Sequence, residues 1–584
     1  MAVYDLIVRN GYIIDGTGAA GYYADIGVQG GRISEIGNLR GVVAKEEIEA
    51  SGMVVAPGHI TQHTHYDAML FWNPYCSNSG ENGVTTVVNA NCGFGFAPVR
   101  AADRERTMQM METTEQIPVR HQQAAMSWDW ETFPEYLERV KALPKGLNVF
   151  SYLPLNPLLV YVMGIEGAKS RKPTASEIAE MHRLINEAMD AGALGISLSA
   201  MGYDGNSHLD FDGTAMPTDA MEIESLIEIG RAVANRGEGI IQMLTNIVSY
   251  GPREFTERMA EMAKGSGARV IHNILITADG RPDLADEGLE WIEGLRRRGL
   301  DVVAQTISRG WVEGGVTELD VSGGQLPAIR EITGCRDQGA LRALLRDPGF
   351  QQRFVEQYRD SGAMTGSAGF EPQTVIDIGP NAELHSYVGR TIGAVAEETG
   401  QTAAEVVLDL TLRSDLALKL KSGSFASSDP AEIVRMIRHP AVTIGVSDGG
   451  AHTKSLAHGY YGTDLLIWLV REHRLMSIEE MHFHLSLKVA NLTKLRNRGA
   501  ILPGYSADLL IYDLDKLFVD HGPMEIVKDM PDGDWRRNVR SGGYHYILVN
   551  GVATHVQDRK TGATPGEFVR WPDNDRGAYQ VAAE

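Results

Sequence analysis

Residues 58–95 read GHITQHTHYDAMLFWNPYCSNSGENGVTTVVNANCGFG and carry metal-binding side chains at two places. Successive side chains of an extended strand point to opposite faces, so His63 and His65 point the same way, roughly 6.6 Å apart along the strand. A second apolar segment, GVTTVVNANCG, ends in Cys92. Imidazole and thiolate are both good ligands for Zn²⁺. His-x-His pairs also arise by chance, and many cysteines are simply small buried residues, so these residues alone do not establish a metal site.

Apolar segments of strand length alternate with helical patterns through the middle of the chain. Residues 176–191 and 220–236 show apolar residues at helical spacing with charged residues opposite. Such alternation favours an α/β fold, a (β/α)8 TIM barrel, in which catalytic groups lie at the carboxyl ends of the strands. The eight predicted barrel strands are VVAPGHI (54–60), TTVVNAN (85–91), NVFSYLP (148–154), ALGISLS (193–199), GIIQMLT (239–245), RVIHNIL (269–275), LDVVAQTI (300–307) and AVTIGVSD (441–448).

The composition limits the partners of the protein. The 584 residues carry a formal net charge of −22 with a pI near 5.3, which argues against binding to nucleic acid or anionic membranes. Three cysteines are too few for a disulfide framework, and the chain has no signal-peptide pattern and no run of about 18 apolar residues. We therefore expect a cytoplasmic homo-oligomer that acts on a small-molecule substrate and has no nucleic-acid or membrane partner.

The segment PGHITQHTHYD, followed by GVTTVVNANCGFGFAPV, resembles the opening of the amidohydrolase superfamily, specifically its N-acyl-D-amino-acid deacylase (D-aminoacylase) branch. The resemblance implies that His63 and His65 bind metal from the first barrel strand and that Cys92 bridges metals from a turn after the second. It also implies a Zn²⁺ cofactor of one or two ions. Thr61 stands where that family usually has an aspartate.

Both ends of the chain show short alternating strands separated by Asn-Gly, Asp-Gly and Gly-Gly turns, a pattern typical of antiparallel sheet. They resemble the composite β-sandwich that amidohydrolases build from both termini. We therefore expect residues 1–56 and 500–584 to form a small β-sandwich domain. Residues 57–499 would form the barrel, with an insertion at about 309–440.

Asp448 lies in TIGVSDGGAH, at the end of the eighth predicted strand. Hydrolysis of an amide or ester at a metal needs a base that accepts a proton from water, and a carboxylate beside the metal suits that role. Ser-Asp-Gly also occurs in ordinary turns. The resemblance implies that Asp448 is a metal ligand and the general acid and base, and we expect it to be the catalytic residue.

Two histidine ligands that the branch normally takes from the fifth and sixth strands are missing from their expected positions. Leu244 and Ile274 stand there, while Gln242 and His272 lie two residues earlier on the same strand faces. Either His272 is a further metal ligand, or a single metal is held by the four residues already named. The segment ALGISLSA contains no lysine, which disfavours the carbamylated-lysine bridge of hydantoinase-type relatives.

The predicted substrate pocket also departs from the branch. D-aminoacylases carry His-Pro-Arg before Tyr-Gly-Thr, with the arginine binding the substrate carboxylate, whereas this chain reads AHGYYGT and has Gly459 in place of the arginine. A planar bidentate donor is therefore missing at that position. The candidate substrate-binding residues are His208, His452 and Tyr461.

The sequence predicts a metal-dependent amidohydrolase that uses a metal-activated water to cleave a carbon–nitrogen amide bond of an N-acyl amino acid or related N-acyl amide. The same groups would also serve a hydrolase of cyclic amides, lactones or esters. An alternative of a different class is a non-catalytic assembly protein with the amidohydrolase fold, since the fifth- and sixth-strand histidines are missing. The metal content of the purified protein distinguishes the two classes, because an assembly protein needs no stoichiometric metal.

Overall fold

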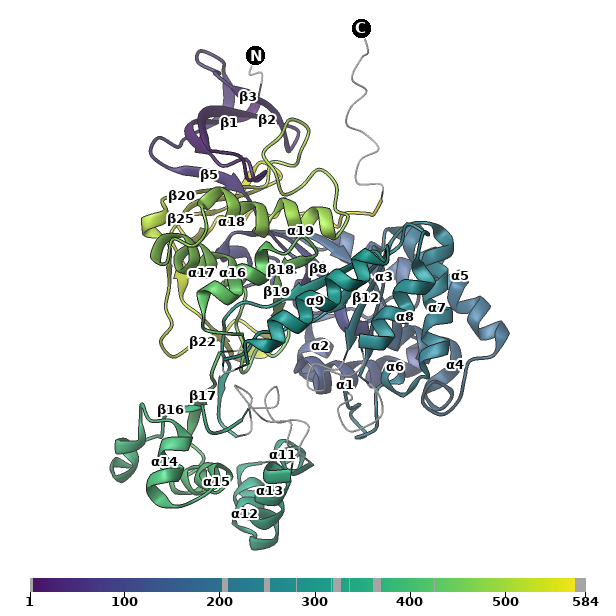
Figure 1. Ribbon diagram of the computed structural model, residues 1–584, viewed down its shortest axis with the longest axis vertical. Helices are drawn as coiled ribbons and strands as arrows, with labels where there is room; N and C mark the ends of the chain where they lie inside the picture. The colour runs from purple at the N-terminus through teal and green to yellow at the C-terminus, as the bar shows by residue number, and fades with distance from the viewer. Residues whose placement is uncertain are drawn as a thin grey trace.

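Eight parallel strand positions close into a ring in the computed structural model. Figure 1 shows the whole chain, coloured from purple at the N-terminus to yellow at the C-terminus. The structure describes residues 4–572 apart from 202–207, 246–252, 280, 317, 319–326, 336, 361–368 and 425. The pairing runs from β6 through β8 to β9, from β10 through β11, β12, β13 and β14 to β18, and from β19 back to β7. The predicted barrel is therefore confirmed. Its strands are β6 (His59–Thr61) with β7 (His63–Thr64), β8 (Val84–Asn89), β9 (Asn148–Ser151) with β10 (Leu153–Pro154), β11 (Gly195–Ala200), β12 (Ile240–Thr245), β13 (Arg269–Asn273), β14 (Val302–Thr306), and β18 (Val442–Ile444) with β19 (Val446–Gly449).

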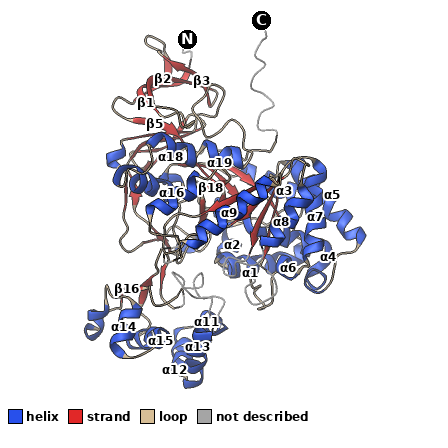
Figure 2. Ribbon diagram, in the orientation of Figure 1, coloured by secondary structure: helices blue, strands red, loops and turns tan. Residues whose placement is uncertain are grey.

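Helices pack around the barrel through apolar faces, and α5 shows how the sequence specifies them (Figure 2). Thr174 and Glu177 form a capping box at its start, and Gly192 ends it in the left-handed conformation at φ 118°. Among the described residues, no helix combines the length and apolar composition that a membrane crossing requires. The surrounding helices include α3 (Phe133–Ala142), α4 (Leu155–Ser170), α5 (Ala175–Ala191), α7 (Ile223–Arg236), α8 (Arg253–Ala263), α9 (Asp283–Arg297), α16 (Pro430–Arg438), α18 (Ile478–Leu485) and α19 (Leu487–Leu492).

The prediction that residues 54–60 form the first barrel strand was wrong for residues 54–57. Val54–Pro57 forms β5, which pairs with β1 and with β20 in the terminal sheet, and only the residues after Gly58 enter the barrel. A Cβ atom at Gly58 would overlap the Thr85 side chain, so the chain passes from one sheet to the other at a position that tolerates only glycine. Residues 55–60 are all buried, so the segment reads as one continuous buried strand although it belongs to two sheets.

Strands from both termini form one nine-stranded sheet, as expected from their turn-rich ends (Figure 1). The two halves meet where β20 pairs antiparallel with β5, with Leu510 opposite Ala56. A second layer that would make this sheet a sandwich stays a prediction, as do the domain boundaries. The strands are β1 (Tyr4–Ile13), β2 (Tyr22–Gln29), β3 (Arg32–Gly37), β4 (Ala44–Glu49), β5 (Val54–Pro57), β20 (Leu509–Tyr512), β25 (Tyr544–Val549), β26 (Val552–Val556) and β27 (Arg559–Lys560).

The long segment between β14 and β18 contains a helical unit with its own buried cluster, which includes Phe350, Phe354 and Phe370. This unit extends away from the barrel at the lower end of Figure 1. The last helix of the segment, α16, packs instead with barrel strand β18, because Ile433 and Ile437 share a cluster with Ile444. The elements of the unit are α11 (Pro327–Thr333), α12 (Gln338–Arg346), α13 (Pro348–Asp360), β16 (Thr374–Asp377), α14 (Ile392–Thr399), α15 (Ala403–Arg413) and β17 (Lys419–Lys421).

Candidate metal centre

His63, His65 and Cys92 form a buried group whose possible ligand atoms all lie within 4.8 Å of one another. The Nε2 atom of His63 lies 3.3 Å from the Cys92 Sγ atom. Asp448 Oδ1 lies 3.4 Å from His63 Nε2 and 3.8 Å from His65 Nε2. The structure thus brings the strand ends of β7, β8 and β19 together around one point, and these four residues are the predicted ligand set.

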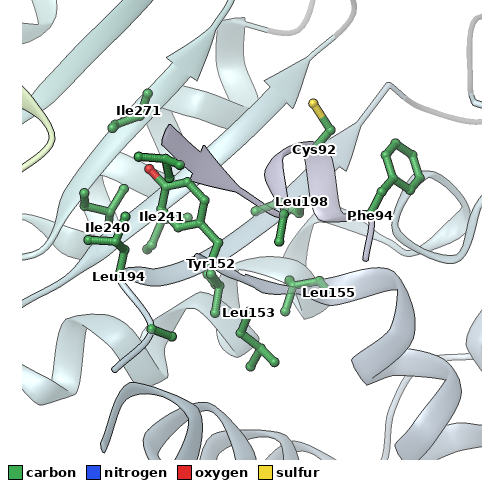
Figure 3. Packing of buried hydrophobic residues seen from close by; sticks show 14 of the residues in the cluster. Cys92, Phe94, Tyr152, Leu153, Leu155, Leu194, Leu198, Ile240, Ile241 and Ile271 are labelled. Atoms are coloured by element: carbon green, nitrogen blue, oxygen red, sulfur yellow. The ribbon is translucent and has the colours of Figure 1, made fainter. Parts of the chain in front are cut away.

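The turn after β8 presents the thiol of Cys92 to this point. Ala90 and Cys92 both adopt left-handed backbone conformations at φ 57°, and Asn91 Nδ2 holds the turn by donating to Val88 O at 2.9 Å. The Cys92 N–H donates to Gln242 Oε1 on β12 at 2.9 Å. Figure 3 shows the Cys92 sulfur pointing away from the apolar side chains of Leu198 and Leu155. Cys92 is therefore directed into the site rather than into the packed core.

Left-handed conformations recur elsewhere in the site. Asp448 has φ 48° and His452 has φ 51°, so four residues of this region that are not glycine occupy a conformation that costs energy. Such strain persists only where the surrounding structure fixes it, and it is concentrated at functional sites. The backbone therefore supports a functional interpretation of this region.

The outer nitrogens of the two histidines face oxygen acceptors. His63 Nδ1 lies 3.1 Å from Gln305 Oε1 on β14, and His65 Nδ1 lies 3.6 Å from Glu115 Oε1. Glu115 is the last residue of α1 (Arg104–Glu115) and is 4% exposed. An amide oxygen only accepts, so Gln305 places the proton of a neutral His63 on Nδ1 and leaves the Nε2 lone pair facing Cys92 and Asp448. The arrangement suits metal binding through the Nε2 atoms.

Sequence reasoning missed both Gln305 and Glu115. Gln305 lies inside a strand that reads as apolar, and the only signal was one amide among the buried residues of LDVVAQTI. Glu115 ends a polar helix 50 residues after His65, and nothing in that helix marks it.

Burial governs the protonation of these groups. It raises the pKa of the Cys92 thiol well above its ordinary value, with a further contribution from the charge of Glu115. Burial, followed by the charge of Asp448, likewise raises the pKa of Glu115. It lowers the pKa of His65 to about 3. Burial would raise the pKa of Asp448, but the neighbouring His63 and His65 rings hold it below the ordinary value. A cation at the site would stabilise the thiolate and both carboxylates.

Two predicted substrate-binding histidines lie beside this group. His452 donates its backbone N–H to Glu115 O at 2.8 Å, and its Nε2 atom lies 3.9 Å from Glu115 Oε2. His208 donates its backbone N–H to Asp219 Oδ2 at 2.9 Å, and its ring packs edge-on against Phe94 at 5.0 Å between centroids. Phe94 follows the Cys92 turn directly, so the structure places His208 next to that turn.

Tyr461 does not lie in the pocket. It begins α17 (Tyr461–Leu465), is 1% exposed, and its hydroxyl lies 3.1 Å from Thr61 Oγ1 and donates to Ile60 O at 3.3 Å. It therefore anchors α17 to β6, and we withdraw it as a substrate-binding residue. The same contact explains the environment of Thr61, whose hydroxyl faces this helix rather than the metal group.

His272 is also turned away from the group. Its Nδ1 atom lies 2.9 Å from Thr256 Oγ1 on α8, and its ring packs on Trp291 of α9 at 4.8 Å between centroids. In the parallel pairing of β12 with β13, His272 lies beside Met243 and shares its face of the sheet. Because Gln242 precedes Met243 in the strand, Gln242 and His272 face opposite sides of the barrel wall. We therefore withdraw His272 as a ligand candidate and retain the site formed by the other four residues.

Comparison with known proteins agrees with the fold. The amidohydrolase family model matches residues 46–275. The D-aminoacylase of Alcaligenes xylosoxydans xylosoxydans is 25% identical over 584 residues, which cover 97% of each chain. A solved D-aminoacylase with a binuclear metal center superposes with a TM-score of 0.63 at 23% identity, covering 97% of this chain and 99% of that one. The N-acyl-D-glutamate deacylase of Bordetella bronchiseptica, solved with zinc and a phosphonate inhibitor, superposes with a TM-score of 0.62 at 21% identity and the same coverage.

Proposed function

Because the chain belongs to the amidohydrolase family, in its D-aminoacylase-like branch, we propose that it is a metal-dependent hydrolase that cleaves a carbon–nitrogen amide bond of a small N-acyl substrate. The observation that carries this proposal is the meeting of two imidazole Nε2 atoms, the Cys92 thiol and the Asp448 carboxylate at the carboxyl ends of barrel strands. In (β/α)8 enzymes this end of the barrel holds the active site.

The donor set fits one Zn²⁺ ion. Around a tetrahedral Zn²⁺ ion, nitrogen and sulfur ligands lie roughly 3.5 Å apart, and the His63 Nε2 to Cys92 Sγ distance is 3.3 Å. The Asp448 Oδ1 atom lies at comparable distances, 3.4 Å from His63 Nε2 and 3.8 Å from His65 Nε2. Bound there, Zn²⁺ supplies a Lewis acid that polarises a carbonyl oxygen and makes a water molecule more acidic.

Asp448 is the residue best placed to move protons. Its side chain is 31% exposed, whereas His63 and His65 are nearly fully buried, so a substrate and a water molecule can reach it. The carboxylate accepts a proton from the attacking water as the carbon–oxygen bond forms. It returns that proton to the leaving nitrogen as the carbon–nitrogen bond breaks, so one water is consumed for each amide cleaved. Because the His63 and His65 rings hold the pKa of Asp448 below its ordinary value, the carboxylate is ionised near neutral pH.

One experiment separates this function from its alternatives. The metal content of purified protein is measured on the same sample that is assayed against open N-acyl amides and against cyclic amides and lactones of matched size. We expect about one equivalent of zinc and turnover of open amides. Faster turnover of the cyclic compounds would identify a ring-opening hydrolase. Protein without stoichiometric metal that hydrolyses none of them would be a non-catalytic assembly protein.

A further inference from the structure

The charged groups around the proposed metal site are anionic. Asp448 faces both metal-binding histidines, and Glu115 faces His65 and His452. Within the described part of the chain, no lysine or arginine pairs with either carboxylate. A substrate anion placed here would meet two carboxylates without a cationic side chain to bind it, and a buried charge without such a partner is costly.

Several cationic side chains at this end of the barrel are bound to other carboxylates, whereas Arg253, at the start of α8, donates to Glu287 O at 3.3 Å and packs over the Trp291 ring. Arg309, just after β14, makes a bidentate pair with buried Asp464 at 2.7 Å for both contacts. Lys454, just after β19, pairs with Asp534 at 2.9 Å.

The same holds for the cations beside the fourth-strand loop. Arg106 of α1 pairs with buried Asp210, which also binds Lys169 at 2.7 Å. The segments 66–83, 201–222 and 246–252, which follow the first, fourth and fifth strands, contain no lysine or arginine in sequence. A free cation for a substrate carboxylate is therefore missing from these segments.

The turn at Gly459 cannot supply one either. A Cβ atom there would lie 2.7 Å from the carbonyl carbon of Asn78 and 2.7 Å from the backbone nitrogen of Ser79. Real Cβ atoms do not approach backbone this closely, so the loop of residues 78–79 occupies the space into which a longer side chain would extend. Glycine at this position is a consequence of packing, and the structure leaves no room for a guanidinium group.

We propose that the enzyme prefers amides whose amine portion carries no carboxylate, such as N-acyl derivatives of simple amines. This inference rests on the proposed function and narrows it. The metal site would bind and cleave the acyl amide, while the Asp448 carboxylate opposes a substrate carboxylate beside it, and Arg309, Lys454, Arg106 and Lys169 are already paired with other carboxylates.

The test uses pairs that differ only in the carboxylate: N-acetyl-2-phenylethylamine against N-acetyl-D-phenylalanine and N-acetyl-L-phenylalanine, repeated with longer acyl chains. Release of the acyl acid by the zinc-loaded enzyme is measured. Because a charge must be desolvated without a partner, we expect kcat/KM for the neutral amide to exceed that for either acid by about 10- to 100-fold. The corresponding methanesulfonyl compounds resist this hydrolysis and can be tested as competitive inhibitors. The neutral compound should inhibit more tightly than either amino-acid derivative.

The possible results distinguish a failure of this inference from a failure of the proposed function. Equal or better hydrolysis of an N-acyl amino acid would overturn the inference and leave the proposed function standing. Hydrolysis of no pair by fully metal-loaded protein would overturn the proposed function and this inference with it.

A gain-of-function variant tests the cause of the preference. His208 lies at the edge of the site with a side chain that is 27% exposed. His208→Lys places a cation there, and we expect it to raise kcat/KM for the N-acyl amino acids relative to the neutral amide. The matched His208→Gln variant also loses the imidazole ring but gains no charge, so it is the reference against which the preference of His208→Lys is compared. Two results together would contradict the electrostatic explanation. The substrate preference of His208→Lys would be unchanged, and the methanesulfonyl derivative of the amino acid would inhibit wild type more tightly than the neutral methanesulfonamide.

Discussion

Cys92 is the ligand with the clearest structural alternative, since its apolar neighbours would also suit a buried filler residue. Cys92→Ser keeps the volume but replaces the thiolate with a hydroxyl that stays protonated near neutral pH. We expect most of the zinc to be lost while the fold persists, as measured by metal analysis and circular dichroism. Cys335→Ser, in the helical unit far from the barrel strands, is the control and should keep its zinc. Full zinc content and activity in Cys92→Ser would show that the thiol is not a ligand.

Gln305 acts on the metal through His63. Gln305→Leu removes the oxygen that accepts from His63 Nδ1, so the ring can rotate or adopt the other tautomer. Loss of such an outer partner weakens metal binding by about 10- to 100-fold. Gln305→Glu restores an acceptor and should recover much of the zinc affinity. The affinity is measured by competition with a chelator, and equal values for the leucine variant and wild type would exclude this role.

At the scale of single elements, the strand patterns predicted the barrel but not the face of every residue. The eight apolar segments are short and fully buried, so period-2 alternation is absent and the inward face is set only by pairing register. That is why His272 was expected at the metal, whereas its pairing with Met243 turns it toward α8 and α9. The division of VVAPGHI between two sheets was hidden for the same reason, because both halves are apolar.

His272→Ala tests the face of β13 directly. The side chain fills space between Thr256 and Trp291, so its loss leaves a cavity and should destabilise the protein by about 2–4 kcal/mol. Zinc content per folded molecule should equal that of wild type. Loss of zinc at unchanged stability would return His272 to the ligand set.

A buried lysine joins α19 to the end of α16 and makes stability depend on pH. Lys488 Nζ donates to His439 O at 2.8 Å and also to Ile437 O, with His484 Nδ1 at 3.3 Å and the charge of Glu480 nearby. Burial lowers the pKa of Lys488 from 10.5 to about 7. Between these values the unfolded chain holds a proton that the folded protein lacks, so this group makes folding more favourable as pH rises from 7.

Denaturant unfolding at pH 7, 8 and 9 measures this effect. The stability of wild type relative to Lys488→Met should rise across the series, by at most about 1.4 kcal/mol per pH unit. Below pH 7 the difference should be constant, since the lysine is protonated in both states. The exposed Lys516→Met variant is the control and should stay parallel to wild type. Parallel curves for wild type and Lys488→Met would contradict the lowered pKa.

At the scale of the whole molecule, the sequence indicated the barrel, the contribution of both termini to one sheet, and the group of His63, His65, Cys92 and Asp448. These features follow from local sequence patterns and from the residues at strand ends, and both can be read from the sequence. Glu115 and Gln305 reach the site through long-range packing of α1 and β14, which no local pattern records. Tyr461 was misplaced for a similar reason, since its hydroxyl is bound to β6 across 400 positions of sequence.

The central claim is that a metal held by His63, His65 and Cys92 works with Asp448 as the acid and base. The most direct measurement is the single-turnover rate of amide cleavage by Asp448→Asn, compared with wild type at equal zinc content. The asparagine keeps the shape and one oxygen but cannot accept the proton, so the chemical step should slow by about 10²- to 10⁴-fold with little change in stability. A zinc-loaded Asp448→Asn enzyme that cleaves the same amide at nearly the wild-type rate would contradict the account.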